Sequence, residues 1–171
     1  MTVENKQNDI AWASMESPIG RLTILADGQG ITEIRFMNNS SPLPPGPGQS
    51  NEWVALTIEQ LNAYFDSRLT SFELPLSLGG TEFQQNVWAQ LQKIDYGSTA
   101  SYGQIAAAID KPKAARAVGM ANNKNAIPII IPCHRVIGSN GALTGFAGGL
   151  DAKRWLLRHE GVCVDDNQGE K

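Results

Sequence analysis

The 171-residue sequence predicts an α/β protein of the α+β kind, in which a small antiparallel sheet with a helix precedes a mostly helical domain. Three observations predict this fold. Short apolar runs separated by turn residues fill residues 11–36, apolar residues recur at helical spacing over 54–65, and helix-capping patterns recur in the second half. We place the domain boundary near Gly80, which gives domains of residues 1–80 and 81–171.

The first domain is predicted from its turns and its apolar periodicity. Turn signals at residues 18–20 and 27–30 interrupt the apolar runs, which favours an antiparallel meander. Residues 38–50 hold four prolines and two glycines, a composition that predicts an exposed loop because it cannot sustain helix or ladder hydrogen bonds. The helical spacing over 54–65 then predicts a helix that packs on the sheet.

The second domain begins with the clearest helix signals of the chain. A capping box opens at Thr81 ahead of apolar residues along one helical face, and a second opens at Ser101 ahead of a shorter helix. Pro112 occupies a position where a first-turn proline is tolerated, before a helix over 114–121. The two short helices, joined by a turn at 110–111, predict a helix-turn-helix.

Two further segments complete the second domain. The run Ile127–Pro132 is apolar, β-branched and punctuated by proline, so we expect it to cross the interior in an extended form. A last helix is expected from Leu150 to Glu160, and Gly161 is a natural residue to end it. Reactive and polar side chains follow the apolar run immediately, so they are expected directly after a buried segment.

Composition limits the setting of the protein. Cys133 and Cys163 are the only cysteines, and no charged segment followed by an apolar one opens the chain, so we expect a reducing, cytoplasmic setting. No apolar stretch approaches the length that crosses a bilayer, so no membrane partner is expected.

The net charge of −3 hides an uneven distribution. Residues 1–80 carry 4 Lys and Arg against 9 Asp and Glu, a net charge of −5, whereas residues 81–161 carry 9 against 5, a net charge of +4. The last ten residues carry 1 against 3, a net charge of −2. The basic stretch favours a nucleic-acid surface, although ordinary surface charge is an alternative interpretation.

Cys133, His134 and Arg135 bring a thiol, an imidazole and a guanidinium together after the apolar run. A thiol near an imidazole can be drawn toward thiolate, its nucleophilic form. From Cys133 alone, a packed apolar cysteine beside a surface His-Arg pair is the more ordinary interpretation. A zinc site is disfavoured because the chain holds two Cys and two His, and adjacent residues chelate poorly together, so no metal is predicted.

Glu160 and Arg116 are two further unusual residues. Glu160 lies in the last turn of the predicted helix, where a carboxylate faces the negative end of the helix dipole, so either a partner or solvent must compensate it. Arg116 is the one long side chain among the small residues 114–119. That pattern fits a helix in the minor groove whose arginine enters the base stack, and a small-residue face packed on another helix is the alternative.

These residues together resemble the O6-alkylguanine-DNA alkyltransferase family over residues 11–161, most like its stand-alone bacterial members. The motifs that carry the resemblance occur in this order: Ser101-Tyr102-Gly103-Gln104, Ala114-Ala115-Arg116-Ala117-Val118-Gly119, Asn125, Pro132-Cys133-His134-Arg135-Val136, Gly148-Gly149 and Trp155-Leu156-Leu157-Arg158-His159-Glu160-Gly161. The resemblance implies a suicide DNA-repair methyltransferase that moves an alkyl group from O6-alkylguanine, or O4-alkylthymine, to its own cysteine, without cofactor or metal.

The resemblance also implies a role for each catalytic residue. Cys133 is the alkyl acceptor, His134 is the base that draws its proton through a water, and Glu160 holds the imidazole. Asn125 bonds across the turn before the active site and shapes the pocket. Tyr102 donates to the lesion base and crowds its phosphate as the base rotates out of the duplex.

The resemblance further implies that the partner is double-stranded DNA bearing alkylated bases, contacted in the minor groove by a monomer. Arg116 is expected to fill the space that the flipped base leaves. The other residues expected to contact DNA are Tyr102, Gly103, Gln104, Ala115, Ala117, Gly119 and Arg135. The residues expected to line the substrate pocket are Val136, Phe146, Ala147 and Gly148.

Three positions depart from the family's common pattern. Ala126 replaces a frequent proline, and Phe146 and Ala147 replace Tyr and Ser, which bears on substrate preference.

Two other functions fit the sequence less well. A non-enzymatic lesion-binding relative is disfavoured by the presence of Cys133, and a cysteine hydrolase is disfavoured because its base is usually remote in sequence.

Overall fold

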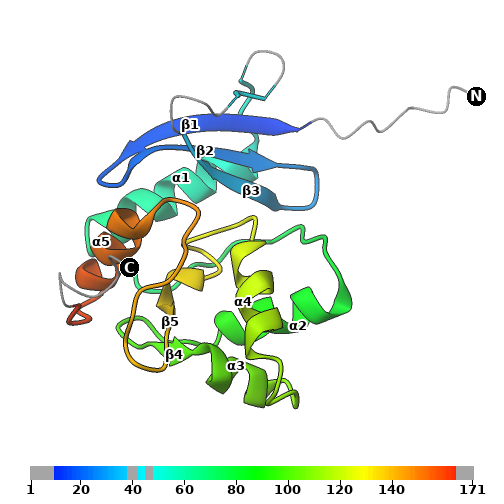
Figure 1. The fold of residues 1–171 in the computed structure, drawn as a ribbon. Coiled ribbons are helices and arrows are strands. Elements are labelled where there is room, and N and C mark those ends of the chain that lie inside the picture. Colours follow the sequence, from blue (N-terminus) through cyan, green and yellow to red (C-terminus); the bar gives the residue numbers. More distant parts are fainter. Residues whose placement is uncertain (1–9, 38–41, 45–47, 165–171) are drawn as a thin grey trace, which may run out of the picture. The chain divides into compact units, whose positions relative to one another are not determined.

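The computed structural model describes residues 10–37, 42–44 and 48–164, and the chain divides into two compact units, Met1–Leu78 and Gly79–Lys171. Each unit is considered by itself. The fold class predicted from the sequence is confirmed, since a three-stranded antiparallel sheet with a helix forms the first unit and a mostly helical domain forms the second (Figure 1). No helix within the described ranges is long and apolar enough to cross a membrane.

The sheet of the first unit is a meander of three strands. β1 (Ala11–Ser17), β2 (Gly20–Ala26) and β3 (Ile31–Phe36) pair antiparallel in sequential order. Gly20 follows the first turn with a φ of +104°, a conformation that glycine adopts without a steric penalty. Residues 22–26 of the central strand are all buried, so β2 forms the middle of this unit's core.

Helix α1 (Glu52–Phe65) covers this sheet, as the apolar spacing predicts. Asn51 caps the helix by accepting a hydrogen bond from the Val54 amide at 2.9 Å. The face that packs on β1 and β2 buries Val54, Leu61 and Tyr64. The predicted loop at 38–50 lies partly outside the described residues, and its described parts form neither helix nor strand.

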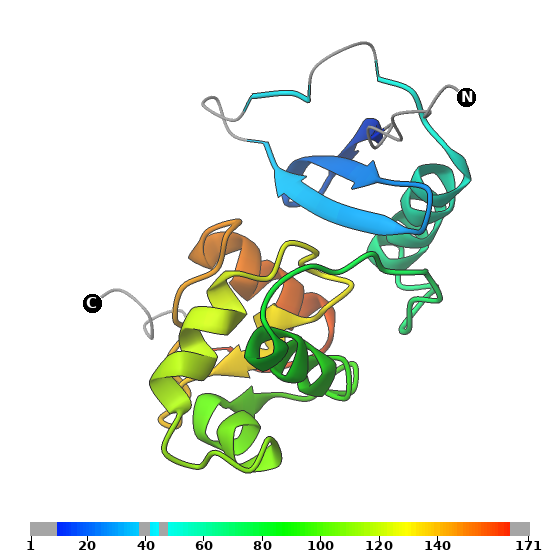
Figure 2. The same cartoon turned by 90° about the vertical axis from the view of Figure 1, so that its right-hand side faces the viewer.

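The second unit is built around three helices, α2 (Glu82–Leu91), α3 (Tyr102–Ala108) and α4 (Ala115–Asn123). Both predicted capping boxes are present, at Thr81 and Ser101, with reciprocal hydrogen bonds to the third helical residue. Helices α3 and α4 pack on each other and on α2, and they form the predicted helix-turn-helix (Figure 2).

The remaining elements surround a short 3₁₀ helix, η1 (Cys133–Arg135). Strand β4 (Ala100–Ser101) pairs in parallel with β5 (Val136–Ile137), which follows η1 directly. Helix α5 (Leu150–His159) packs on η1, and Glu160 is its C-cap residue. Gly161 follows with a φ of +84°, as expected of the residue that ends a helix.

The prediction of an extended run over Ile127–Pro132 is wrong in one respect. The segment is buried as expected, but it folds into a tight turn in which the Ile131 amide donates to the Ile127 carbonyl at 3.0 Å. Its two prolines lack amide donors and so cannot extend a strand ladder. Ile129 takes a φ of +74°, which is strained for a β-branched residue and is imposed by the packing around the buried turn.

Candidate active site

Cys133 is the first residue of η1 and comes directly after the buried turn. Its side chain is 5% exposed, and its amide donates to the Ile131 carbonyl at 2.7 Å. Burial of the preceding isoleucines fixes the backbone from which the thiol projects. As the sequence predicts, the thiol of Cys133 directly follows a buried segment, and the backbone that carries it is fixed by that segment.

Glu160 is the centre of a buried polar network. Its Oε2 accepts a hydrogen bond from His134 Nε2 at 2.8 Å, and Arg135 donates to Oε1 through Nε at 2.7 Å and to Oε2 through Nη2 at 3.0 Å. The side chains of Glu160 and His134 are fully buried. This network is the compensation that the position of Glu160 at the negative end of α5 requires.

The hydrogen bond to Glu160 determines how His134 can act. A carboxylate only accepts hydrogen bonds, so Nε2 carries the proton and Nδ1 presents its lone pair. Nδ1 has no hydrogen-bond partner within the described part of the chain. Burial lowers the pKa of His134, while the bond to Glu160 opposes this shift. The resting imidazole is thus neutral and able to accept a proton at Nδ1.

Burial favours the protonated thiol of Cys133 in the resting protein, in agreement with the packed apolar cysteine that the sequence left open as an interpretation. Burial raises the pKa of Cys133 to about 11, although a hydrogen bond from Asn125 and the positive charge of Lys153 act in the opposite direction. At neutral pH the sulfur therefore keeps its proton until a base removes it. The sequence alone did not settle this, because adjacency says nothing about desolvation.

Two asparagines support the backbone around Cys133. Asn125 Nδ2 donates to the Ile131 carbonyl at 2.8 Å, and its Oδ1 accepts from the Ile127 amide at 3.0 Å. It thus spans the turn, which is where the family resemblance places it. Asn122, which the sequence did not single out, donates from Nδ2 to the Cys133 carbonyl at 3.5 Å. Its position among small residues on α4 gave no sign of this contact.

Arg135 lies elsewhere than expected. Its grouping with DNA-contacting residues needs correction, because it is 6% exposed and its guanidinium also donates to the Ile94 carbonyl at 2.6 Å. It stacks over the Tyr96 ring at 5.8 Å. Arg135 is a structural cation that neutralises Glu160, and a phosphate cannot reach it.

The other expected DNA contacts lie on the helix-turn-helix. Arg116, Gly103, Gln104 and Ala117 are exposed, and Ala115, Gly119 and Tyr102 are half-buried. Gln104 already uses its Oε1 to accept the Ser101 amide in the capping box. The hydroxyl of Tyr102 is hydrogen-bonded to that of Thr144, and burial raises the pKa of Tyr102, which keeps the phenol protonated.

The expected pocket residues follow Cys133 along the chain. Val136 is fully buried in β5, Ala147 is exposed and Gly148 is half-buried. Phe146 lies edge-on to the His134 ring, with centroids 6.5 Å apart and planes at 74°. Of this set, Phe146 is the residue that the structure brings against the His134 imidazole.

Lys153 is the clearest residue that sequence analysis missed. It is fully buried on α5, and its Nζ donates to the Val136 carbonyl at 2.7 Å and the Thr144 carbonyl at 2.9 Å. A signal was present in the sequence. Leu156 and Leu157 lie three and four residues further on, so Lys153 occupies the apolar stripe of its helix.

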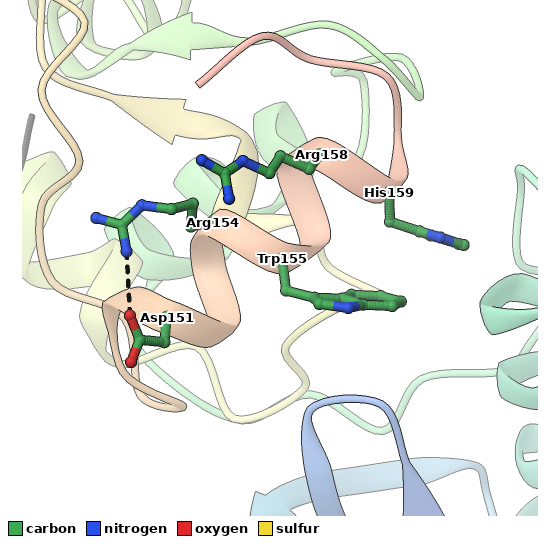
Figure 3. Close-up of a pocket in the computed structure, with 5 residues that line it drawn as sticks. All are labelled: Asp151, Arg154, Trp155, Arg158 and His159. Carbon is green, nitrogen blue, oxygen red and sulfur yellow. Dashed lines mark hydrogen bonds and ion pairs between the residues drawn. The ribbon is translucent and has the colours of Figure 1, made fainter. Parts of the chain in front are cut away.

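A hollow of about 500 Å³ lies on the surface of α5, apart from the predicted catalytic residues (Figure 3). Its lining residues are Asp151, Arg154, Trp155, Arg158 and His159. The rings of Trp155 and His159 stack with centroids 4.7 Å apart. The hollow includes neither the thiol nor the residues around it.

Comparison with known proteins is consistent with this site. Residues 10–78 match the ribonuclease-like domain of 6-O-methylguanine DNA methyltransferase, and residues 82–162 match its DNA-binding domain. The methylated-DNA–protein-cysteine methyltransferase of Methanosarcina acetivorans is 48% identical over 154 residues, 89% of this chain and 99% of that protein. The Mycobacterium tuberculosis (strain H37Rv) protein of the same description is 47% identical over 156 residues, 88% and 92% of the two chains.

Solved structures of related proteins have a similar fold. The crystal structure of Mycobacterium tuberculosis O6-methylguanine methyltransferase superimposes with a TM-score of 0.80 at 46% identity, covering 88% of this chain and 92% of that one. A structure of the protein from the same bacterium in complex with DNA has a TM-score of 0.80 at 47% identity, with the same coverage. The fold, the cysteine site and these likenesses define a DNA-binding methyltransferase. The chain belongs to the 6-O-methylguanine DNA methyltransferase family.

Proposed function

We propose that Cys133 is the methyl acceptor of this protein and that His134, Glu160 and Tyr102 handle the protons of the transfer. The reaction is direct-reversal repair, in which the methyl group of O6-methylguanine in DNA moves to a cysteine of the protein itself. The observation that carries the assignment is the buried hydrogen bond between His134 and Glu160, because it fixes the imidazole of the residue that directly follows the buried thiol of Cys133.

The transfer begins with removal of the thiol proton. His134 accepts it at Nδ1 through a bridging water, and Glu160 stabilises the resulting imidazolium at Nε2. The sulfur then attacks the methyl carbon. The new S–C bond forms as the C–O6 bond breaks, and the electron pair stays on the guanine oxygen.

Tyr102 supplies the acid for the leaving oxygen. Its phenol remains protonated because burial raises its pKa, so it can donate as negative charge develops on the base. The phenolate and the imidazolium then regain their resting protonation states by exchange with solvent. The product is a stable thioether, so each molecule reacts once.

The DNA is held by the helix-turn-helix in the minor groove. The methyl carbon lies within the base stack of intact DNA, so the base must rotate out before a buried thiol can reach it. Arg116 is exposed on α4 among small residues, and we assign it the space that the base leaves. One cysteine and one such helix in each chain are enough for a single lesion, so we propose that the protein acts as a monomer.

The substrate range follows from the pocket side chains. Phe146 and Ala147 lack hydroxyls, so recognition of the base depends on shape and backbone groups at these positions. We therefore propose O6-methylguanine as the principal substrate, with larger O6-alkyl groups and O4-methylthymine as substrates to be ranked by measurement. The two unpaired cysteines fit a reducing compartment, and we place the protein in the cytoplasm.

The decisive experiment is intact mass measurement after incubation with duplex DNA containing O6-methylguanine. We expect a gain of one methyl group, located on Cys133 by peptide mapping. Cys133→Ala should bind the DNA without reacting, and Cys163→Ser, which changes the exposed cysteine, should react normally. Tight binding with no loss of the lesion would instead indicate a lesion-binding protein, and methylation at Cys163 would overturn the assignment.

A further inference from the structure

Lys153 presents a physical problem that the reaction described above does not solve. Lysine is almost never fully buried unless it is paired, yet its side chain is fully buried here and forms no ion pair with a described carboxylate. Its ammonium group donates hydrogen bonds to two backbone carbonyls, and its positive charge also lowers the pKa of Cys133. Burying a cation has a desolvation cost, so we examine which backbone segments the Lys153 hydrogen bonds hold in place.

The two carbonyls belong to segments with different roles. Val136 begins β5, directly after the helix that carries the nucleophile. Thr144 belongs to residues 138–149, which contain neither helix nor strand. Bonds of 2.7 Å and 2.9 Å from one Nζ therefore fasten an irregular segment to the strand beside Cys133.

The fastened segment carries a contact to Tyr102. The Thr144 hydroxyl and the Tyr102 hydroxyl are hydrogen-bonded to each other, although the two residues are 42 positions apart. Thr144 is exposed, so its hydroxyl would be free to rotate toward water if its backbone were not held. A continuous path thus runs from the buried ammonium through the Thr144 backbone and side chain to the phenol.

We propose that Lys153 and Thr144 are positioning residues for Tyr102, with Lys153 fixing the Thr144 backbone so that the Thr144 hydroxyl aims the phenol at the leaving oxygen. This inference rests on the role proposed above for Tyr102. It explains why a lysine occupies an apolar stripe, and it gives Thr144 a function that its exposure alone would not indicate. The burial that raises the pKa of Tyr102 is consistent with a donor that must be aimed accurately.

The test is a double-mutant cycle on the single-turnover rate of methyl transfer from O6-methylguanine in duplex DNA. Thr144→Val removes the hydroxyl at nearly constant shape, and Thr144→Ser retains it. We expect Thr144→Val to slow transfer about threefold to tenfold at unchanged DNA affinity, as loss of one hydrogen bond predicts, and Thr144→Ser to restore most of the rate. Tyr102→Phe should slow transfer about 100-fold.

Coupling between the two positions is the decisive readout. In the Tyr102→Phe background, Thr144→Val should cause no further loss, because the phenol that it positions is gone. Independent, multiplicative losses would overturn the proposal, as would a wild-type rate for Thr144→Val. A wild-type rate for Tyr102→Phe would refute the proposed role of Tyr102, whereas absence of methyl on Cys133 in the wild type would refute the proposed function itself.

Lys153→Met tests the other end of the path. If it folds, as judged by a cooperative thermal transition, we expect slower transfer with two components. The loss that acts through Thr144 should disappear in the Tyr102→Phe background, and the loss that acts through the charge of Lys153 on Cys133 should remain. A loss equally large in both backgrounds would overturn the proposal. If it fails to fold, the Thr144 variants still decide the proposal, because Thr144 is exposed and its substitution removes no buried group.

Discussion

At the scale of single residues, we expect Glu160 to affect both the stability and the reactivity of the protein. Its two carboxylate oxygens accept three hydrogen bonds from two basic side chains, all shielded from water. Loss of either partner of a buried ion pair is destabilising, because it leaves the other charge buried and uncompensated. Removing the charge therefore affects the fold through Arg135 and the chemistry through His134.

We expect Glu160→Gln to lower the free energy of unfolding by about 3 kcal/mol, because it leaves the buried Arg135 without a counter-charge. Methyl transfer should slow about 100-fold through the loss of support for His134. Chemical denaturation and single-turnover rates measure these effects. Glu59→Gln, an exposed change in the middle of α1, is the control and should alter stability by less than about 0.5 kcal/mol. Equal stability of both variants would contradict the network.

His134 gives the protein a pH dependence of defined sign. Burial holds its folded pKa below the ordinary 6.5, so below that pH the unfolded chain binds a proton that the folded chain does not. The free energy of unfolding should fall by up to about 1.4 kcal/mol per pH unit as pH drops below about 6.5. The fall should end where the folded imidazole is protonated as well.

Denaturant titrations at about pH 7.5 and about pH 5.5 measure this contribution. His134→Gln should lose it, whereas His159→Gln, which changes the half-buried histidine stacked on Trp155, should keep it. The same slope in wild type and His134→Gln would assign the effect to another group.

The sequence identified a residue that conflicts with its local surroundings, but it could not show which way a side chain points. The carboxylate of Glu160 lies at the negative end of the helix dipole, and this unfavourable position marked it as a residue that needs a partner. Arg135 was misassigned because adjacency to Cys133 does not say whether a side chain faces solvent or Glu160. Lys153 was overlooked, although its position in an apolar stripe indicated the burial that the structure shows.

At the scale of elements, capping boxes provide a matched pair of experiments. Thr81 and Ser101 start α2 and α3 with the same hydrogen-bond pattern, but only α3 carries Tyr102 and the proposed DNA contacts. Helix starts of this kind are encoded locally, which is why the sequence located both of them. The turn at Ile127–Pro132 depends instead on proline and on Asn125 closing it, so apolar character alone gave the burial but not the shape.

We expect Thr81→Ala and Ser101→Ala to lower the free energy of unfolding by similar amounts, about 1 kcal/mol each. Only Ser101→Ala should also slow methyl transfer, because fraying of α3 displaces Tyr102. Thermal unfolding and single-turnover kinetics on both variants distinguish the effects. Equal kinetics in the two variants would separate α3 from the reaction.

Arg116 is tested at the level of helix α4. Arg116→Ala should slow repair in duplex DNA more than reaction with free O6-benzylguanine, since the free base needs no extrusion. Arg68→Ala, an exposed arginine of the first unit, should change neither rate. Equal losses on both substrates would assign Arg116 to the pocket or the fold.

At the scale of the whole molecule, charge is divided between the two units. The acidic first part and the basic second part give a net charge of −3 that conceals a DNA-binding surface. The sequence indicated this division because counting charges needs no structure, and the fold class followed from periodicity. What it could not give was the set of contacts around Cys133, which join residues far apart in the chain.

The small number of cations near the helix-turn-helix predicts a DNA affinity that is modest and sensitive to salt. The exposed basic residues of the helix-turn-helix are Lys111, Lys113, Arg116 and Lys124. Four contacts at most correspond to a slope of log affinity against log salt no steeper than about −4. Fluorescence anisotropy with labelled duplex measures it, and Arg116→Ala should make the slope shallower by about 1. A much steeper slope would require cations from elsewhere in the chain.

The position of Glu160 also has a consequence for synthesis of the protein. The carboxylate that fixes the imidazole is 26 residues downstream of His134. A ribosome therefore completes the cysteine and the imidazole well before the group that orients them, and a chain released in this interval carries the thiol without an aligned proton acceptor. We therefore expect chains that end before α5 to react slowly with damaged DNA, because the carboxylate that aligns His134 is missing from them.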